Sequence, residues 1–288
     1  MMRRRIAGLL SLFVLAGVCP PSSLSQDVVV FVSDRDGNRE IYSMQSDGRR
    51  QVNLSQHRGK DQAPALSPDR KQIAWISDRS GQVAIWRMAV NGSAKKLVRE
   101  TPDADFGLAW SPDGRELAVT LQSGDNGTHD IAVLEIDSGR LRRLTDTPSV
   151  EEITPAWNKD GDELFYIAGS GSATSLMRRH LKTGDRSVVV SGLPRAGFPV
   201  VSPNGTEILV RSRTDQFDVL RIKLETGTIE NLTEHNANDW GGVWSPDGGS
   251  IFFASDRDGD MEIYALDLVS RRLKQLTKNE NRDWTPSL

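Results

Sequence analysis

The sequence predicts an all-β chain, a six-bladed β-propeller of four-stranded antiparallel blades that occupies residues 26–288. Two observations lead to this prediction: a short turn segment recurs every 43–47 residues, and the two ends of the chain carry complementary parts of one further repeat. The composition agrees, because a hydrophobic fraction of 37% suits many short, half-exposed strands better than a thick helical core.

The recurring segment is of the Ser-Pro-Asp-Gly type. Its serine, proline and glycine stand where a type I turn favours them. Five copies begin at Ser67, Ser111, Asn158, Ser202 and Ser245. The interval between copies fits one propeller blade and exceeds most helical repeats.

The same alternation of strands and turns follows each copy. In the last complete repeat, an apolar strand at 251–254 leads to a Ser-Asp-Arg-Asp-Gly turn at 255–259. A third strand at 262–264 and a fourth ending near 275–277 come next. Three tight turns between four strands predict an up-and-down antiparallel sheet, which is one blade.

The sixth blade is expected to form from both ends of the chain. Residues 283–288 match the approach to the first strand, as at 61–66, while residues 31–37 resume the pattern in the second strand. We therefore expect the C-terminal strand to pair with the N-terminal strands and close the ring. Closure would leave no open inner edge.

Residues 1–25 are expected to be a secretory signal peptide. Three arginines precede an apolar run at 6–18 that is too short to cross a bilayer comfortably, and small residues precede a cleavage site after Ser25. The only cysteine, Cys19, follows Val18 rather than a small residue, so lipid anchoring there is the less favoured alternative. The expected location is periplasmic or secreted.

The expected mature chain is acidic and has no segment that could span a membrane. Removing residues 1–25 takes away three arginines and no acids, which leaves 33 basic and 39 acidic residues and a net charge of −6. This balance argues against nucleic acid as a partner, because phosphate binding needs a basic patch. We expect a monomer.

The last repeat also resembles the repeat of the TolB-like propeller family, whose units are called PD40 or WD40-like repeats. The resemblance rests on residues 244–248, 253–259 and 262–264 and extends over nearly all of residues 26–288. It implies a six-bladed propeller and a role in protein binding, since TolB's propeller docks a peptidoglycan-associated lipoprotein. We expect no counterpart of TolB's N-terminal α/β domain, which contacts the inner-membrane Tol complex, so the resemblance does not imply that role.

Acidic residues recur six positions before the turn serine or its equivalent. They are Asp61, Asp105, Glu152, Asp239 and Asp283, with Ala196 at the sixth place beside Arg195. Converging at one mouth of the channel, these carboxylates would favour a divalent cation or a basic partner. The alternative is structural: each carboxylate holds backbone N–H groups of its own loop.

Aromatic residues adjoin this ring of acids at Phe106, Trp240 and Trp284. Exposed aromatic residues beside charges often anchor interfaces, so these three complete the candidate binding site, although packing between blades is the alternative. The tryptophans just before the turns, Trp110, Trp157 and Trp244, are expected to pack between blades instead.

Signals for catalysis are weak. His57 and His235 occupy equivalent places ten residues before a turn serine and are the candidates for holding a metal. No nucleophile elbow, phosphate loop or His-Glu-x-x-His motif occurs. The sequence favours a non-enzymatic module for protein–protein interaction in the cell envelope. The alternatives are a metal-dependent sugar-acid lyase or other hydrolytic propeller enzyme, and a scaffold that uses its outer blade edges.

Overall fold

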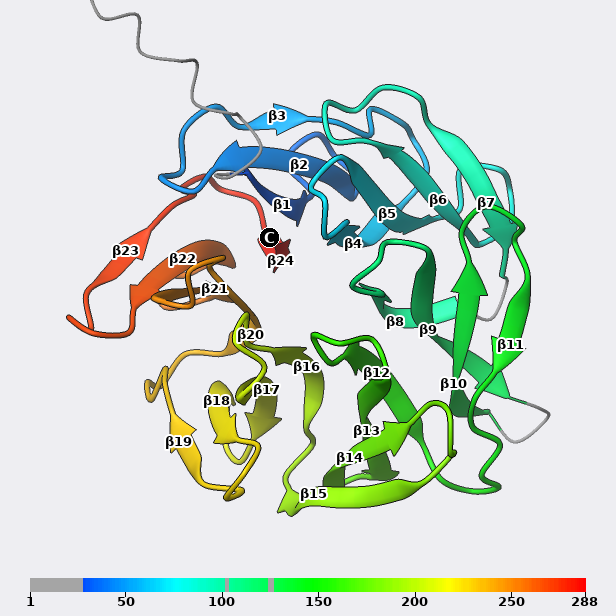
Figure 1. Ribbon diagram of the computed structural model, residues 1–288. Coiled ribbons are helices and arrows are strands. Elements are labelled where there is room, and N and C mark those ends of the chain that lie inside the picture. Colours follow the sequence, from blue (N-terminus) through cyan, green and yellow to red (C-terminus); the bar gives the residue numbers. More distant parts are fainter. Residues whose placement is uncertain (1–27, 102–103, 124–126) are drawn as a thin grey trace, which may run out of the picture.

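A computed structural model describes residues 28–101, 104–123 and 127–288, without the side chains of 104–106 and 123. The expected signal peptide, with Cys19, lies outside these ranges. The described residues form 24 strands in six four-stranded sheets arranged around a common axis (Figure 1). No helix of membrane-spanning length and apolarity occurs in the described ranges. The all-β, six-bladed prediction is confirmed.

The strands are short and follow one another blade by blade. The first blade contains β1 (Val28–Ser33), β2 (Glu40–Gln45) and β3 (Val52–Asn53), to which β24 (Asp283–Ser287) is added. The second and third contain β4 (Asp61–Leu66), β5 (Gln72–Ser77), β6 (Ala84–Ala89) and β7 (Lys96–Glu100), then β8 (Ala104–Trp110), β9 (Glu116–Ser123), β10 (Thr128–Glu135) and β11 (Leu141–Arg143).

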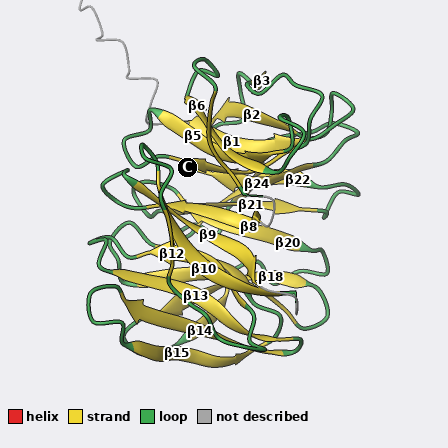
Figure 2. Cartoon of the chain, turned by 90° about the vertical axis from the view of Figure 1, so that its right-hand side faces the viewer, coloured by secondary structure: helices red, strands yellow, loops and turns green. Residues whose placement is uncertain are grey.

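The second half of the chain repeats the arrangement. The fourth blade contains β12 (Glu152–Trp157), β13 (Glu163–Ser170), β14 (Ala173–His180) and β15 (Arg186–Leu193). The fifth contains β16 (Gly197–Val201), β17 (Glu207–Arg213), β18 (Phe217–Lys223) and β19 (Ile229–Asn231), and the sixth contains β20 (Asp239–Trp244), β21 (Ser250–Ser255), β22 (Glu262–Asp267) and β23 (Leu273–Gln275). Seen from the side, the blades consist of strands joined by loops (Figure 2).

The ring closes as the sequence predicts. Strand β24 pairs antiparallel with β1, with Val32 opposite Trp284 and Ser33 opposite Asp283. Leu66 donates its backbone N–H to the Ser287 hydroxyl at 3.0 Å, which ties the inserted strand to the second blade as well. In Figure 1 the red β24 lies beside the blue β1, so one blade combines the two ends of the described chain.

The recurring turn owes its shape to its serine and acid. In the first copy the Ser67 hydroxyl donates to Asp69 at 2.7 Å and accepts the Gln72 backbone N–H at 2.9 Å. The turn is closed by a bond from the Arg70 N–H to the Ser67 carbonyl at 2.8 Å. The side chain thus supplies partners for backbone groups that the turn would otherwise leave unpaired.

Arg70 occupies the place that glycine holds in the four other copies of the turn. Its φ of 59° lies in the left-handed region, where a side chain is strained. We expect Arg70→Gly to raise the free energy of unfolding by up to about 1 kcal/mol, measured by urea denaturation. Gly114→Arg, at φ 70°, is the mirror experiment and should lower the free energy of unfolding. If Arg70→Gly were less stable than the wild type, the backbone at Arg70 would not be strained.

The tryptophans before the turns join neighbouring blades, as predicted. Trp110 is 8% exposed, and its indole N–H donates to the Ala65 carbonyl of the preceding blade at 2.9 Å. Trp157 and Trp244 form the same bond to preceding inner strands, at 3.0 Å each. The bulk of the indole fills the space between blades, while its one polar group is satisfied.

Each inner strand is interrupted by a bulge near its start, where the register against the second strand shifts. The residue at the bulge has a positive φ in all six blades, between 48° and 61°. We call these residues the bulge ring; they are Ala63, Gly107, Thr154, Phe198, Gly241 and Thr285. All six residues of the bulge ring line the central cavity, one from each blade.

Candidate functional site

The six inner strands enclose a channel cavity of about 650 Å³. It extends from the end where these strands begin, here called the entry end, to the end occupied by the serine-proline turns. Gln62, Trp240 and Trp284 line the entry end, and prolines such as Pro68 and Pro246 line the other. The lining is dominated by apolar side chains and contains no carboxylate side chain.

The predicted acids lie beneath this surface. Asp61, Asp239 and Asp283 are 0% exposed and Glu152 is 2% exposed, so these four carboxylates do not form an exposed negative rim. Their contacts indicate a structural role, as in the alternative, but the donors are arginine, tryptophan and asparagine side chains rather than backbone N–H groups of the loop. Asp105 and Phe106 belong to β8, but their side chains lie outside the described part of the chain.

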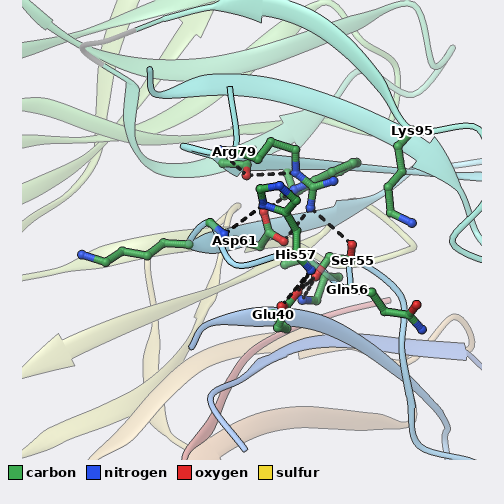
Figure 3. Close-up of polar contacts among 12 residues, drawn as sticks. Glu40, Ser55, Gln56, His57, Asp61, Arg79 and Lys95 are labelled. Atoms are coloured by element: carbon green, nitrogen blue, oxygen red, sulfur yellow. Dashed lines mark hydrogen bonds and ion pairs between the residues drawn. The ribbon is translucent and has the colours of Figure 1, made fainter. Parts of the chain in front are cut away.

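Three of the acids are held by an arginine from the turn after the second strand of the same blade. Arg79 reaches Asp61 at 2.7 Å, Arg257 reaches Asp239 at 2.9 Å and Arg35 reaches Asp283 at 2.6 Å. In Figure 3 the Arg79 side chain extends to Asp61 beside the loop that carries His57. A buried carboxylate is tolerated because its charge is paired in this way.

Aromatic rings complete each of these arginine sites. The Arg79 guanidinium carbon lies 5.0 Å from the Trp75 ring centre and 5.4 Å from that of Trp86. The Trp75 indole N–H donates to Asp61 at 2.9 Å. Arg35 and Arg257 have equivalent aromatic pairs, within 5.8 Å. Ring faces favour the cation, so ion pair and rings together fix the loops at the entry end.

A second acid on the third strand lies near the buried aspartate of the following blade. Burial raises the pKa of Glu40, and the charge of Asp61 adds to this. Burial and Asp239 do the same to the pKa of Asp218. For Glu262, burial and the neighbouring Asp283 raise the pKa to about 7. Blade boundaries at the entry end therefore contain close carboxyl groups that disfavour simultaneous ionisation.

The fourth and fifth blades depart from this pattern. Glu152 contacts Arg186 of β15 at 3.4 Å, and its second oxygen has no hydrogen-bond partner. In the fifth blade Ala196 replaces the acid and is 4% exposed. No carboxylate is therefore available at this position of the fifth blade.

The two predicted tryptophans at the entry end are half-buried and lie against arginines. Trp284 is flanked by Arg39, at 5.5 Å, and Arg282, at 5.4 Å from its ring centre. Trp240 lies 4.5 Å from the Arg211 guanidinium carbon. At the entry end of the channel, these tryptophan rings and the arginines against them therefore take the place of the exposed carboxylates that the sequence predicted.

The candidate metal ligands keep the equivalence that the sequence predicts, but each serves its own loop. His57 accepts the Gly59 backbone N–H at its Nδ1 atom at 2.9 Å, and His235 accepts that of Ala237 at 3.1 Å. Among the described residues, no three His, Cys, Asp or Glu side chains gather where they could hold a metal ion.

The sequence did not single out the arginines, although a signal for them exists. Arg79 and Arg257 follow their aspartates by 18 residues in both blades, and the serine-aspartate-arginine turn repeats. The bulge ring had little signal, because four of its members are not glycine. A backbone position, rather than a residue type, is repeated there.

Comparisons with known proteins agree with this architecture. The family profile described as "TolB beta propeller domain" (PD40) matches residues 16–147 and 151–288. The Tol-Pal system protein TolB of Francisella tularensis subsp. tularensis (strain WY96-3418) is 30% identical over 132 residues, which are 45% of this chain and 29% of that protein. The alignment thus spans less than a third of the relative's length.

Solved structures are similar over most of the chain. TolB from Acinetobacter baumannii superposes with a TM-score of 0.80 at 17% identity, covering 91% of this chain and 66% of that one. A putative TolB from Agrobacterium tumefaciens gives a TM-score of 0.69 at 20% identity, covering 88% of each chain. Six PD40-type blades, closed by β24, therefore place this chain in the family of TolB β-propeller domains.

Proposed function

We propose that this propeller is a non-enzymatic binding module of the cell envelope, exported to the periplasm, that takes up a protein or peptide partner at the entry end of its channel. Membership of the TolB propeller family supports the proposal, as does the naming of relatives as Tol-Pal system proteins. The basic and apolar N-terminal segment supports export.

One observation favours the entry end of the channel as the binding surface. Trp240 and Trp284 line the cavity at the entry end, where each is half-buried and lies against arginine. Large aromatic residues at the edge of a concave, mostly apolar site are common anchors of binding energy. The buried aspartates below them fix the surrounding loops through ion pairs and so pre-organise the surface.

Affinity capture from an envelope extract tests the proposal. We expect Trp240→Ala and Trp284→Ala each to reduce recovery of the captured partner by about tenfold or more, because truncating an anchor removes buried contact area. Val188→Ala is the control: this side chain on the outer strand β15 is 57% exposed.

The outcomes separate two surfaces. Equal recovery by both tryptophan variants would contradict the entry end as the binding surface. Loss of recovery with Val188→Ala alone would instead indicate a scaffold that binds through its outer blade edges. Circular dichroism and melting curves of each variant establish that the fold is retained.

A further inference from the structure

The fifth blade contains a cation that the repeat does not explain. Arg211 in β17 is paired in register with Gly197, next to Ala196, where the carboxylate of other blades is missing. Its counterparts are apolar: Ile76 in the second blade and Ala254 in the sixth. The Arg211 side chain makes no ion pair or hydrogen bond with any described residue.

Three aromatic rings surround the Arg211 guanidinium. Its central carbon lies 4.3 Å from the ring centre of Phe217, 4.5 Å from that of Trp240 and 4.8 Å from that of Phe198. We call Arg211 and these three residues the arginine–aromatic cluster. Trp240 and Phe198 also line the channel cavity, so these two members of the cluster form part of its wall at the entry end, and the Arg211 guanidinium lies against both of them.

Ring faces balance the charge of a guanidinium but leave its N–H donors without acceptors. Arginine has five such donors in a planar fork, and Nε of Arg211 is buried with no partner. A buried donor without an acceptor costs about 1–3 kcal/mol. Burial lowers the pKa of Arg211 to about 10, so the side chain is still charged at neutral pH.

The surroundings hold this geometry in place. Phe198 belongs to the bulge ring, with φ 53°, and its backbone N–H donates to the Thr154 hydroxyl at 3.1 Å. Phe217 and Trp240 contact each other with ring centres 4.6 Å apart. The glycine at 197 leaves room for the guanidinium, because a Cβ there would lie 3.1 Å from the Nη2 atom.

We propose that the arginine–aromatic cluster is a carboxylate-binding site that receives an acidic side chain or chain end of a peptide entering the channel. A carboxylate matches the guanidinium fork with two parallel hydrogen bonds and satisfies donors that the chain leaves open. The inference rests on the proposed function and specifies the chemistry of the partner.

A peptide fits this site better than a sugar acid. The cavity beside the cluster is lined mostly by proline, valine, leucine, alanine and tryptophan side chains. A polyhydroxylated chain would lose hydrogen bonds to water on entering such a surface, whereas apolar side chains next to an acidic residue would gain contact. The carboxylate at Arg211 would fix the orientation of the peptide, and contact with the apolar cavity wall would supply most of the binding free energy.

Calorimetric titration of the purified protein tests the site with defined probes. The principal probe is a blocked hexapeptide of alternating glutamate and leucine, and its glutamine–leucine counterpart has the same shape without charge. We expect at least tenfold weaker binding of the neutral peptide. Arg211→Met should weaken binding of the acidic peptide at least tenfold, and Arg211→Lys, which keeps the charge without the fork, should weaken it several-fold.

Arg115→Met is the matched control, because Arg115 is exposed and lies at the opposite end of the inner strands, 3.9 Å from Asp113. It should bind the acidic peptide like the wild type. The melting temperature of Arg211→Met should be unchanged or higher, since a half-buried cation whose buried Nε donor has no partner is removed. A lower melting temperature with unchanged peptide binding would overturn the proposal and assign Arg211 a purely structural role.

Further outcomes separate the ligand from the proposed function. Binding of tetragalacturonate, but not of the acidic peptide, would overturn the proposal in favour of a sugar acid. If an envelope partner is captured equally by Arg211→Met and wild type, the proposed function stands and the carboxylate site fails. If no partner is captured while peptide binding depends on Arg211, the site stands and the proposed function fails.

Discussion

Arg79→Ala is expected to lower the free energy of unfolding by about 3–5 kcal/mol, because it leaves the Asp61 carboxylate charged, buried and without its cation. The two groups lie 2.7 Å apart, with side-chain exposures of 7% and 0%. The variant also removes the cation that lies against the Trp75 and Trp86 rings. Chemical denaturation monitored by circular dichroism measures the loss.

A surface pair provides the matched comparison. Arg115 lies 3.9 Å from Asp113 with 85% of its side chain exposed, and Arg115→Ala should cost less than about 1 kcal/mol. The double variant Asp61→Leu with Arg79→Met removes both charges and should recover much of the stability lost in Arg79→Ala. A loss below 1 kcal/mol for Arg79→Ala would show that Asp61 does not depend on its arginine.

Glu262→Gln should make the propeller more stable than the wild type above neutral pH. Glu262 is 0% exposed, and burial together with the nearby Asp283 raises its pKa from 4.5 to about 7. Thr277 and Asn279 lower the pKa through hydrogen bonds without cancelling the effect of burial. Glutamine keeps the shape and removes the charge that must be buried at high pH.

The raised pKa sets the pH range of this effect. The folded chain retains the Glu262 proton above pH 4.5, where the unfolded chain releases it, so this contribution is fully present below pH 4.5 and is lost as pH rises through about 7. The stability difference between wild type and Glu262→Gln should therefore widen by on the order of 1–3 kcal/mol from pH 5 to 8.

Melting temperatures across that range provide the measurement. Glu100→Gln, at an exposed position of β7, is the control and should follow the wild-type curve. Parallel curves for wild type and Glu262→Gln would contradict the buried, proton-retaining state of this carboxyl group.

The fold was predictable because the information in it is repeated. The turns beginning at Ser67, Ser111 and Ser245 each predict one blade, and the complementary sequences at the two chain ends predict the closure by β24. The tryptophans before the turns recur in register, so their burial between blades followed from their position. Repetition allows a weak local signal to be recognised because it is seen several times.

The candidate site was less predictable, because it depends on which side chains contact one another in the fold rather than on where a residue stands in the repeat. The sequence shows that acids recur at equivalent places in the blades, but whether Asp239 faces solvent or pairs with Arg257 is decided by a turn 18 residues away. Arg211 is not repeated at the equivalent positions of the second and sixth blades, which hold Ile76 and Ala254. The aromatic rings around it, those of Phe198, Phe217 and Trp240, come from two blades. Such a departure from the repeat has no periodic signal.

Closure by β24 imposes an order on synthesis and folding. The contact between Arg35 and Asp283 joins residues 248 positions apart, so β1 has an unpaired edge until β24 leaves the ribosome. An exposed edge strand invites pairing with other chains, and long-range pairing slows folding. The nascent protein therefore carries its greatest risk of misassembly before the last few residues of the ring are made.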